Sequence, residues 1–246
     1  MAQKFYYDST NTLGSTLNDG TGTTTFSDSA SITNEERAID QSTSTAITDF
    51  DQSDSLRFDY GAAVTNDFIA LHFSSGTGVD VNVYDSDNGT TCSLNTTITS
   101  AFSTGWNVSA LTSESHRYWL LYAGSGAIAN LTEVFFGVAL EFTINPDIGI
   151  SEQEIFGTEV NRSAGGVEYA VKKHNPISTW TLNFANISST FKASLQSMEA
   201  EVQDYKKFLW YDETNYHYVR LESPIKYTEV AYQRYSASIS LREQLS

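Results

Sequence analysis

The chain has 246 residues, of which 18% are charged and 13% aromatic, and its formal net charge is −16. This length suits one large domain or two modest ones. An acidic chain lacks the positive patches that hold phosphate backbones, so we expect no specific nucleic-acid binding. Residues 1–147 hold 18 acidic and 4 basic residues against 12 and 10 in 148–246, which favours two domains of different character.

Signals for crosslinking and targeting are few. Cys92 is the one cysteine, so no intrachain disulfide can form. No basic run with an apolar segment opens the sequence, and no 18-residue apolar stretch occurs in it. We therefore expect no membrane insertion, and a soluble chain made inside a cell.

Alternating apolar and polar residues predict strands through the first half. Residues 8–54 are rich in Ser, Thr, Asp, Asn and Gly, and short strands or loops both fit them. From Ser55 the alternation is regular, with turns at 76–78 and 85–89. Such spacing without helices is typical of a sandwich, and we predict a jelly-roll domain over 1–147, ending near the Pro and Gly of 145–149. The strands are predicted at 56–60, 67–73, 79–84, 106–108, 117–122 and 132–142.

The second half contains the one convincing helix pattern of the sequence. Apolar side chains recur at steps of three and four residues, which predicts an α-helix over about 189–208. Ser188 and Ser189 offer hydroxyls for an N-cap, and Lys206 and Lys207 suit the negative end of the helix dipole. The apolar stripe consists of Phe191, Leu195, Met198, Val202, Tyr205 and Leu209.

Strands surround this helix in the sequence. We predict them at 178–185, 207–211 and 216–221, followed by a long closing strand over 227–241, with a tight turn at Gly165–Gly166. Residues 148–246 therefore read as an antiparallel β-sandwich flanked by one α-helix. The fold class of the whole chain is mainly β.

Motifs for catalysis are missing. His72, His116, His174 and His217 are scattered without a close ligand pair, and no nucleophile elbow, P-loop or dinucleotide motif occurs. The 30 acidic residues show no spacing that fixes a glycosidase pair. We expect no enzyme, no catalytic residue and no cofactor.

One run of oxygen-bearing residues invites comparison with a calcium site. Asp80, Asn82, Asp85, Asp87 and Asn88 lie beside a glycine turn. They lack the spacing and the twelfth-position glutamate of an EF-hand. A solvated hairpin turn explains them, and we predict no metal.

Aromatic residues supply the candidate binding positions. Trp106, between Gly105 and Asn107, is the candidate glycan contact, while Trp119 lies within a strand pattern and is expected in the core. Core packing is the alternative for Trp106.

The order of motifs adds a resemblance to a known family. It is carried by IALHFSSGTGVDVNVYDSD, TGWNVSALTSESHRYWLLYAG and TEVFFGVALEF, then by NRSAGGVEYAV, WTLNFANIS, KKFLWYD and AYQRYSASISLRE. This order resembles minor or distal tail proteins of long-tailed bacteriophages, in which a galactose-binding-like jelly roll precedes a tail-tube-like sandwich with one helix. The resemblance covers residues 55–246 and is one of layout more than of invariant residues.

The resemblance implies a structural virion protein. Residues 148–246 would form a hexameric ring at the tail tube or tail tip, beside neighbouring tail-tube and tail-tip proteins, after assembly in the host cytoplasm. The aromatic hairpin at 208–218 then predicts Trp210, Tyr211, Tyr216 and Tyr218 at a subunit interface, with packing inside the chain as the alternative. The alternative function is a carbohydrate-binding adhesion module whose partner is a host surface glycan.

Overall fold

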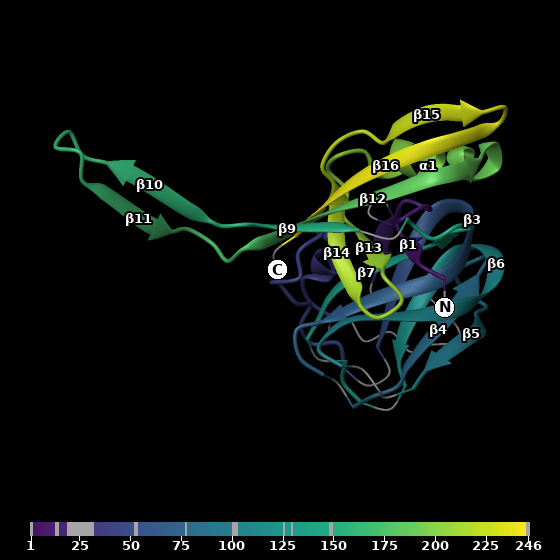
Figure 1. Ribbon diagram of the computed structural model, residues 1–246. Coiled ribbons are helices and arrows are strands. Elements are labelled where there is room, and N and C mark those ends of the chain that lie inside the picture. Colours follow the sequence, from purple (N-terminus) through teal and green to yellow (C-terminus); the bar gives the residue numbers. More distant parts are fainter. Residues whose placement is uncertain are drawn as a thin grey trace. The chain divides into compact units, whose positions relative to one another are not determined.

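The computed structural model describes residues 2–12, 15–18, 32–51, 54–76, 78–99, 103–124, 126–128, 130–147 and 150–244. They divide into two compact units (Figure 1). Unit 2 is Tyr6–Leu140, and unit 1 takes the residues up to Phe5 together with those from Glu141 onward. A division into independently folding domains at 147 and 148 stays a prediction. The mainly β fold class is confirmed, and among the described residues no helix is long and apolar enough to span a membrane.

Unit 2 is built around two long antiparallel strands. β3 and β6 are each 19 residues long, whereas the sequence predicted two shorter strands for each. The pairing of β3 with β6 shifts register between Asp59 and Val64. β3 therefore continues as one strand through the residues where the alternation of apolar and polar side chains is interrupted. The sheet order is β2-β3-β6-β4-β5, with β7 also paired to β3. The elements are β2 (Thr16–Asn18), the 3₁₀ helix η2 (Glu35–Ile39), β3 (Ser55–Phe73), β4 (Val81–Ser86), β5 (Ser93–Ile98), β6 (Gly105–Ala123) and β7 (Leu131–Gly137).

The bent strands place two layers face to face. The C-terminal half of β6 pairs with β4, and the C-terminal half of β3 pairs with β7. Phe136 of β7 lies edge-on to Phe58 of β3, with ring centroids 5.2 Å apart, and 5.7 Å from the ring of Trp119 on β6. All three rings are buried, which confirms the core position expected of Trp119. The first half is therefore a β-sandwich, as the alternation predicted.

The backbone packs closely at Gly137, at one edge of this core. Gly137 ends β7 beside Tyr7, and a Cβ atom there would lie 2.3 Å from the carbonyl oxygen of Tyr7. Only glycine permits that approach. Nearby, the buried Thr12 hydroxyl contacts the Tyr60 hydroxyl at 2.9 Å.

Unit 1 is built on a second sheet, with order β8-β1-β13-β14-β16-β12-β9 and β15 paired to β16; in this order β9 and β12–β16 form antiparallel pairs. The predicted long closing strand is wrong: it is a hairpin of β15 and β16, because the chain reverses where Gln233 takes a φ of 56°. The strands are β1 (Lys4–Tyr6), β8 (Leu140–Glu141), β9 (Ser151–Ile155), β12 (Ile177–Ser188), β13 (Phe208–Tyr211), β14 (Tyr216–Leu221), β15 (Lys226–Ala231) and β16 (Arg234–Glu243).

The predicted helix exists as α1, Ser189–Val202, and is shorter than expected. The Phe191 N–H donates to the Ser188 hydroxyl at 3.1 Å, which is the N-cap that the sequence indicated. Helical geometry ends at Gln203, whose φ is 48°. Tyr205 is consequently 57% exposed, and Leu209 belongs to β13 instead of the stripe. Phe191, Leu195, Met198 and Val202 are buried.

A two-stranded ribbon completes unit 1. β10 (Thr158–Arg162) and β11 (Glu168–Lys172) pair only with each other among the described strands, and every residue in them is exposed. Gly166 lies in their connection with a φ of 82°, as expected for the predicted turn. Figure 1 shows this ribbon extending beyond the strands β9 and β12 that lead into it.

Candidate functional site

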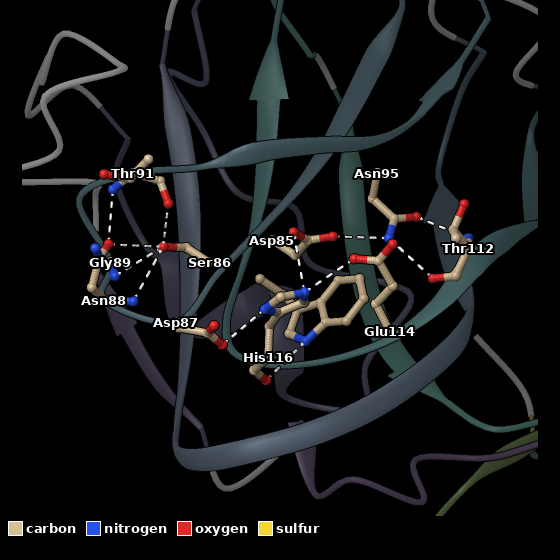
Figure 2. Close-up of polar contacts among 11 residues, drawn as sticks. Asp85, Ser86, Asp87, Asn88, Gly89, Thr91, Asn95, Thr112, Glu114 and His116 are labelled. Atoms are coloured by element: carbon tan, nitrogen blue, oxygen red, sulfur yellow. Dashed lines mark hydrogen bonds and ion pairs between the residues drawn. The ribbon is translucent and has the colours of Figure 1, made fainter.

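Four titratable side chains meet in unit 2, and we call them the His116 cluster: Asp85, Asp87, Glu114 and His116 (Figure 2). Asp85 lies near the end of β4, and Asp87 lies in the turn that follows it. Glu114 and His116 are two residues apart in β6, so both project from the same face of that strand. Strand pairing of β4 with β6 therefore assembles the cluster from segments about 30 residues apart in sequence.

The His116 imidazole is the centre of the cluster. Its Nδ1 lies 2.8 Å from the Asp87 carboxylate, and its Nε2 lies 3.1 Å from Glu114 and 3.5 Å from Asp85. Burial alone would lower the pKa of His116. The hydrogen bonds to Asp87 and Glu114, with the charges of Asp85 and Asp87, outweigh burial and raise that pKa above its usual value.

Asp85 is held in place from its other side. Its side chain is only 3% exposed, and its second oxygen accepts a hydrogen bond from the Asn95 amide at 2.9 Å. Asn95 is itself fixed by Thr112, since it donates to the Thr112 carbonyl and accepts from the Thr112 N–H, both at 3.0 Å. The position of the Asp85 carboxylate is therefore determined by two strands.

The turn after β4 is stabilised by its own polar side chains. The Asn88 carboxamide oxygen accepts the N–H groups of Thr90 and Thr91 at 2.9 and 2.8 Å. The Ser86 hydroxyl donates to the Thr91 carbonyl at 2.6 Å and accepts the Gly89 N–H at 3.0 Å. Asn88 therefore serves the turn, in agreement with the hairpin-turn interpretation, whereas Asp85 and Asp87 point to His116 (Figure 2).

A half-buried tyrosine forms a second feature of unit 2, which we call the Tyr118 surface: Arg57, Asp59, Arg117 and Tyr118. The guanidinium of Arg117 lies 4.8 Å from the centre of the Tyr118 ring, and that of Arg57 lies 5.6 Å from it. Arg117 also binds both oxygens of Asp59, at 2.7 and 2.9 Å. The hydrogen bond from Arg117 is the main cause that lowers the pKa of Asp59, so this carboxyl is ionised at neutral pH.

More aromatic residues share the sheet face of Tyr118. Register places Tyr118 opposite Ser86, and Tyr122 opposite Asn82. Because side chains alternate along a strand, Tyr84 lies on this face too, and its ring centre is 6.1 Å from that of Tyr122. Leu94 of the neighbouring strand is 53% exposed. This face of unit 2 thus combines apolar rings with planar polar groups.

Trp106, the predicted glycan contact, lies elsewhere on β6. It is half-buried and packs edge-on to His72, at 5.1 Å between ring centres, and against the buried Phe135 at 5.4 Å. Burial lowers the pKa of His72, so that imidazole is neutral at pH 7. Trp106 as a glycan contact stays a prediction.

The four predicted interface residues of unit 1 differ in exposure. Trp210 is 2% exposed and stacks on His217, with ring centres 5.0 Å apart, and Tyr218 is 9% exposed. Both are packed within their own chain, which leaves little of them for a neighbouring subunit. Tyr211 and Tyr216 are partly exposed and contact each other at 4.9 Å.

Sequence reasoning missed the His116 cluster. Asp85 and Asp87 were noticed as part of a turn, but Glu114 and His116 were not joined to them. Glu-x-His in a strand, which places both side chains on one face, was the available signal. Among the described residues, Asp85, Glu114 and His116 form a group whose ligand atoms all lie within 4.8 Å of one another.

No protein-family model matches the chain, and no curated protein does. Solved structures do resemble it. Chitosan-binding module 2 of a chitosanase/glucanase from Paenibacillus sp. IK-5, in complex with chitotriose, is 12% identical, covers 51% of this chain and 97% of its own, and has a TM-score of 0.40. Chitosan-binding module 1 of the same enzyme, solved as a point mutant, is 16% identical, covers 54% and 99%, and has a TM-score of 0.42.

A third structure is CBM32-5 of CpGH89 from Clostridium perfringens, in complex with GalNAc-β-1,3-galactose. It is 12% identical, covers 53% of this chain and 98% of its own, and has a TM-score of 0.39. At such scores the likeness by itself decides neither the fold nor the function of this chain.

The predicted resemblance to bacteriophage tail proteins is corrected by these comparisons. The solved structures reported above are carbohydrate-binding modules and not tail proteins. The hexameric ring, the tail-tube-like description of residues 148–246 and the tail-tube and tail-tip partners lose their support with it. The reason for placing the chain in a virion is lost as well.

Proposed function

We propose that unit 2 is a carbohydrate-binding module and that the Tyr118 surface is its sugar contact. One observation carries the proposal: the Tyr118 ring lies beside the paired Arg117 and Asp59 on a partly exposed sheet face. A sugar ring presents a flat C–H face and a rim of hydroxyl groups. It therefore needs an aromatic platform together with planar donors and acceptors, which is the usual composition of a small-ligand site.

The Arg117–Asp59 pair suits the hydroxyl rim. A guanidinium has five N–H donors in a fixed plane, and two of them are used on Asp59. The remaining donors and the carboxylate oxygens match neighbouring sugar hydroxyls, which both donate and accept. Arg57 hydrogen-bonds the Gly89 carbonyl at 3.4 Å and so fixes the turn that packs against the Tyr118 ring.

Binding of sugars to the full chain tests the proposal. Chitotriose and GalNAc-β-1,3-galactose are the first probes, because the compared modules were solved with them. A glycan array followed by isothermal titration calorimetry would measure saturable binding that free sugar competes away. We expect Tyr118→Ala to weaken affinity by about tenfold or more, a loss of about 1.4 kcal/mol, because the platform is removed. Tyr118→Phe keeps the ring and should bind within about threefold of the wild type.

Two further variants make the result specific. Tyr211→Ala removes a partly exposed tyrosine from unit 1 and should leave affinity unchanged. Trp106→Ala should also leave it unchanged, and loss of binding in that variant alone would place the sugar at the position predicted from the sequence. A wild-type chain that binds no sugar on the array refutes the carbohydrate-binding function.

A further inference from the structure

We propose that Asp85, Glu114 and His116 bind a divalent transition-metal cation, with Zn²⁺ as the best fit. The first argument is spacing. Two ligand atoms on one tetrahedral zinc ion lie about 3.3 Å apart, since each bond is about 2.0–2.1 Å long. His116 Nε2 lies 3.1 Å from Glu114 Oε2 and 3.5 Å from Asp85 Oδ1, so both separations already suit a shared ion.

The orientation of the imidazole is the second argument. Metal-binding histidines usually donate their other ring N–H to a carboxylate, which fixes the tautomer and leaves the first nitrogen as the ligand. Asp87 accepts from His116 Nδ1 at 2.8 Å in this way. When the cation displaces the proton that Nε2 shares with Glu114, the proton on Nδ1 stays with Asp87. The lone pair of Nε2 is then directed toward the cation, which lies between the two carboxylates.

Preorganisation of the deepest ligand is the third argument. Asp85 is nearly buried, and the Asn95 amide, itself held by the Thr112 backbone, fixes its second oxygen. Glu114 is 48% exposed and leaves the site open to solvent, so ions can enter and water can complete the coordination. Among the described residues, His116 is the one basic group that forms an ion pair with Asp85, Asp87 or Glu114.

The donor set selects the ion. One imidazole nitrogen with two carboxylates suits zinc or manganese, whereas calcium prefers six to eight oxygen ligands. This site shares Asp85 with the run of Asp and Asn residues in the sequence, but its other two ligands, Glu114 and His116, come from β6, and Asn88 belongs to the turn. It goes beyond the proposed sugar binding and does not depend on it.

Titration of the full chain with ZnCl₂ after chelator treatment and dialysis tests the site. We expect one saturable site per chain, with Ca²⁺ unable to compete at equal concentration. His116→Gln should lower zinc affinity by about 100-fold or more, and Asp87→Asn by about tenfold, because it removes only the partner that orients the imidazole. His174→Gln is the matched control: it removes an exposed histidine of unit 1 and should change affinity less than twofold.

A second measurement needs no variant. Co²⁺ substituted for Zn²⁺ should shift one exchangeable imidazole N–H proton far downfield in the proton NMR spectrum, and that signal should vanish in D₂O. It is the Nδ1–H that His116 donates to Asp87. Absence of saturable zinc binding, equal affinity in folded His116→Gln, or a cobalt complex without that signal would overturn the proposal. Sugar binding is measured separately, with the metal-free chain. Failure of the zinc-binding proposal therefore leaves the sugar-binding proposal standing, and the reverse holds too.

Discussion

The packing of α1 gives a sharp stability prediction for Met198→Ala. Met198 is fully buried, as are Phe191, Leu195 and Val202, and α1 packs on β12 and β16 of its sheet. Truncating a buried methionine to alanine costs about 2–5 kcal/mol, of which the better helix propensity of alanine returns only a few tenths. We expect a loss of about 3 kcal/mol, and hence a midpoint lowered by roughly 12 °C for a unit of this size.

Tyr205→Ala is the matched control for that variant. Tyr205 belongs to the same apolar stripe in the sequence, but it is 57% exposed, so its loss should change stability by no more than about 0.5 kcal/mol. Circular dichroism at 222 nm during thermal and urea unfolding follows the transition, since α1 is the one α-helix among the described residues. Equal losses in the two variants, or a Met198→Ala midpoint within a degree or two of the wild type, would show that α1 does not bury this face.

Two further predictions concern acid stability and backbone packing. Burial by itself raises the pKa of Asp212, but hydrogen bonds from Asn215, His217 and Thr214 outweigh it and lower that pKa below 3.8. A lowered folded pKa adds stability that is present above the unfolded value of about 4 and is lost as pH falls through the folded pKa. Asp212→Asn should therefore lower the free energy of unfolding by about 1 kcal/mol at neutral pH, and the two proteins should become equally stable in acid. Urea titrations at several pH values measure this. A difference in stability that persists below both pKa values contradicts the prediction. Gly137→Ala should lower the free energy of unfolding by about 3 kcal/mol or more, since its Cβ would lie 2.3 Å from the Tyr7 carbonyl oxygen. Gly78→Ala is the control: no atom lies within 4 Å of its Cβ, so stability should change by no more than about 0.5 kcal/mol. Equal melting temperatures of the two variants would argue against the Gly137 contact.

Local chemistry explains which parts of the fold the sequence could predict. The start of α1 was found because the Ser188 cap and the first apolar positions are neighbours in the chain. Its end was missed because the stripe continues by chance through Tyr205, while the stop depends on the backbone of Gln203, a residue with no intrinsic preference for that conformation. The reversal at Gln233 was missed for the same reason.

The candidate sites show the limit of sequence reasoning more clearly. Asp85 and His116 meet because β4 pairs with β6 in one register, and a single sequence does not display that register. Trp210 is a different case. It lies opposite His217 across a four-residue turn, so the pairing that buries it follows from the predicted hairpin and could have been derived.

The path of the chain through unit 1 has a consequence for folding. β1 hydrogen-bonds β13 in the same sheet, and nearly all of unit 2 lies between them in sequence. Contacts this distant in sequence form slowly, because a long loop must close before the pairing contributes any free energy. During synthesis unit 2 can fold as soon as β7 is complete, while β1, which has β8 on one side, stays without its second neighbour until β13 is made. A strand synthesised near the start of the described chain thus depends on one of the last strands to be made.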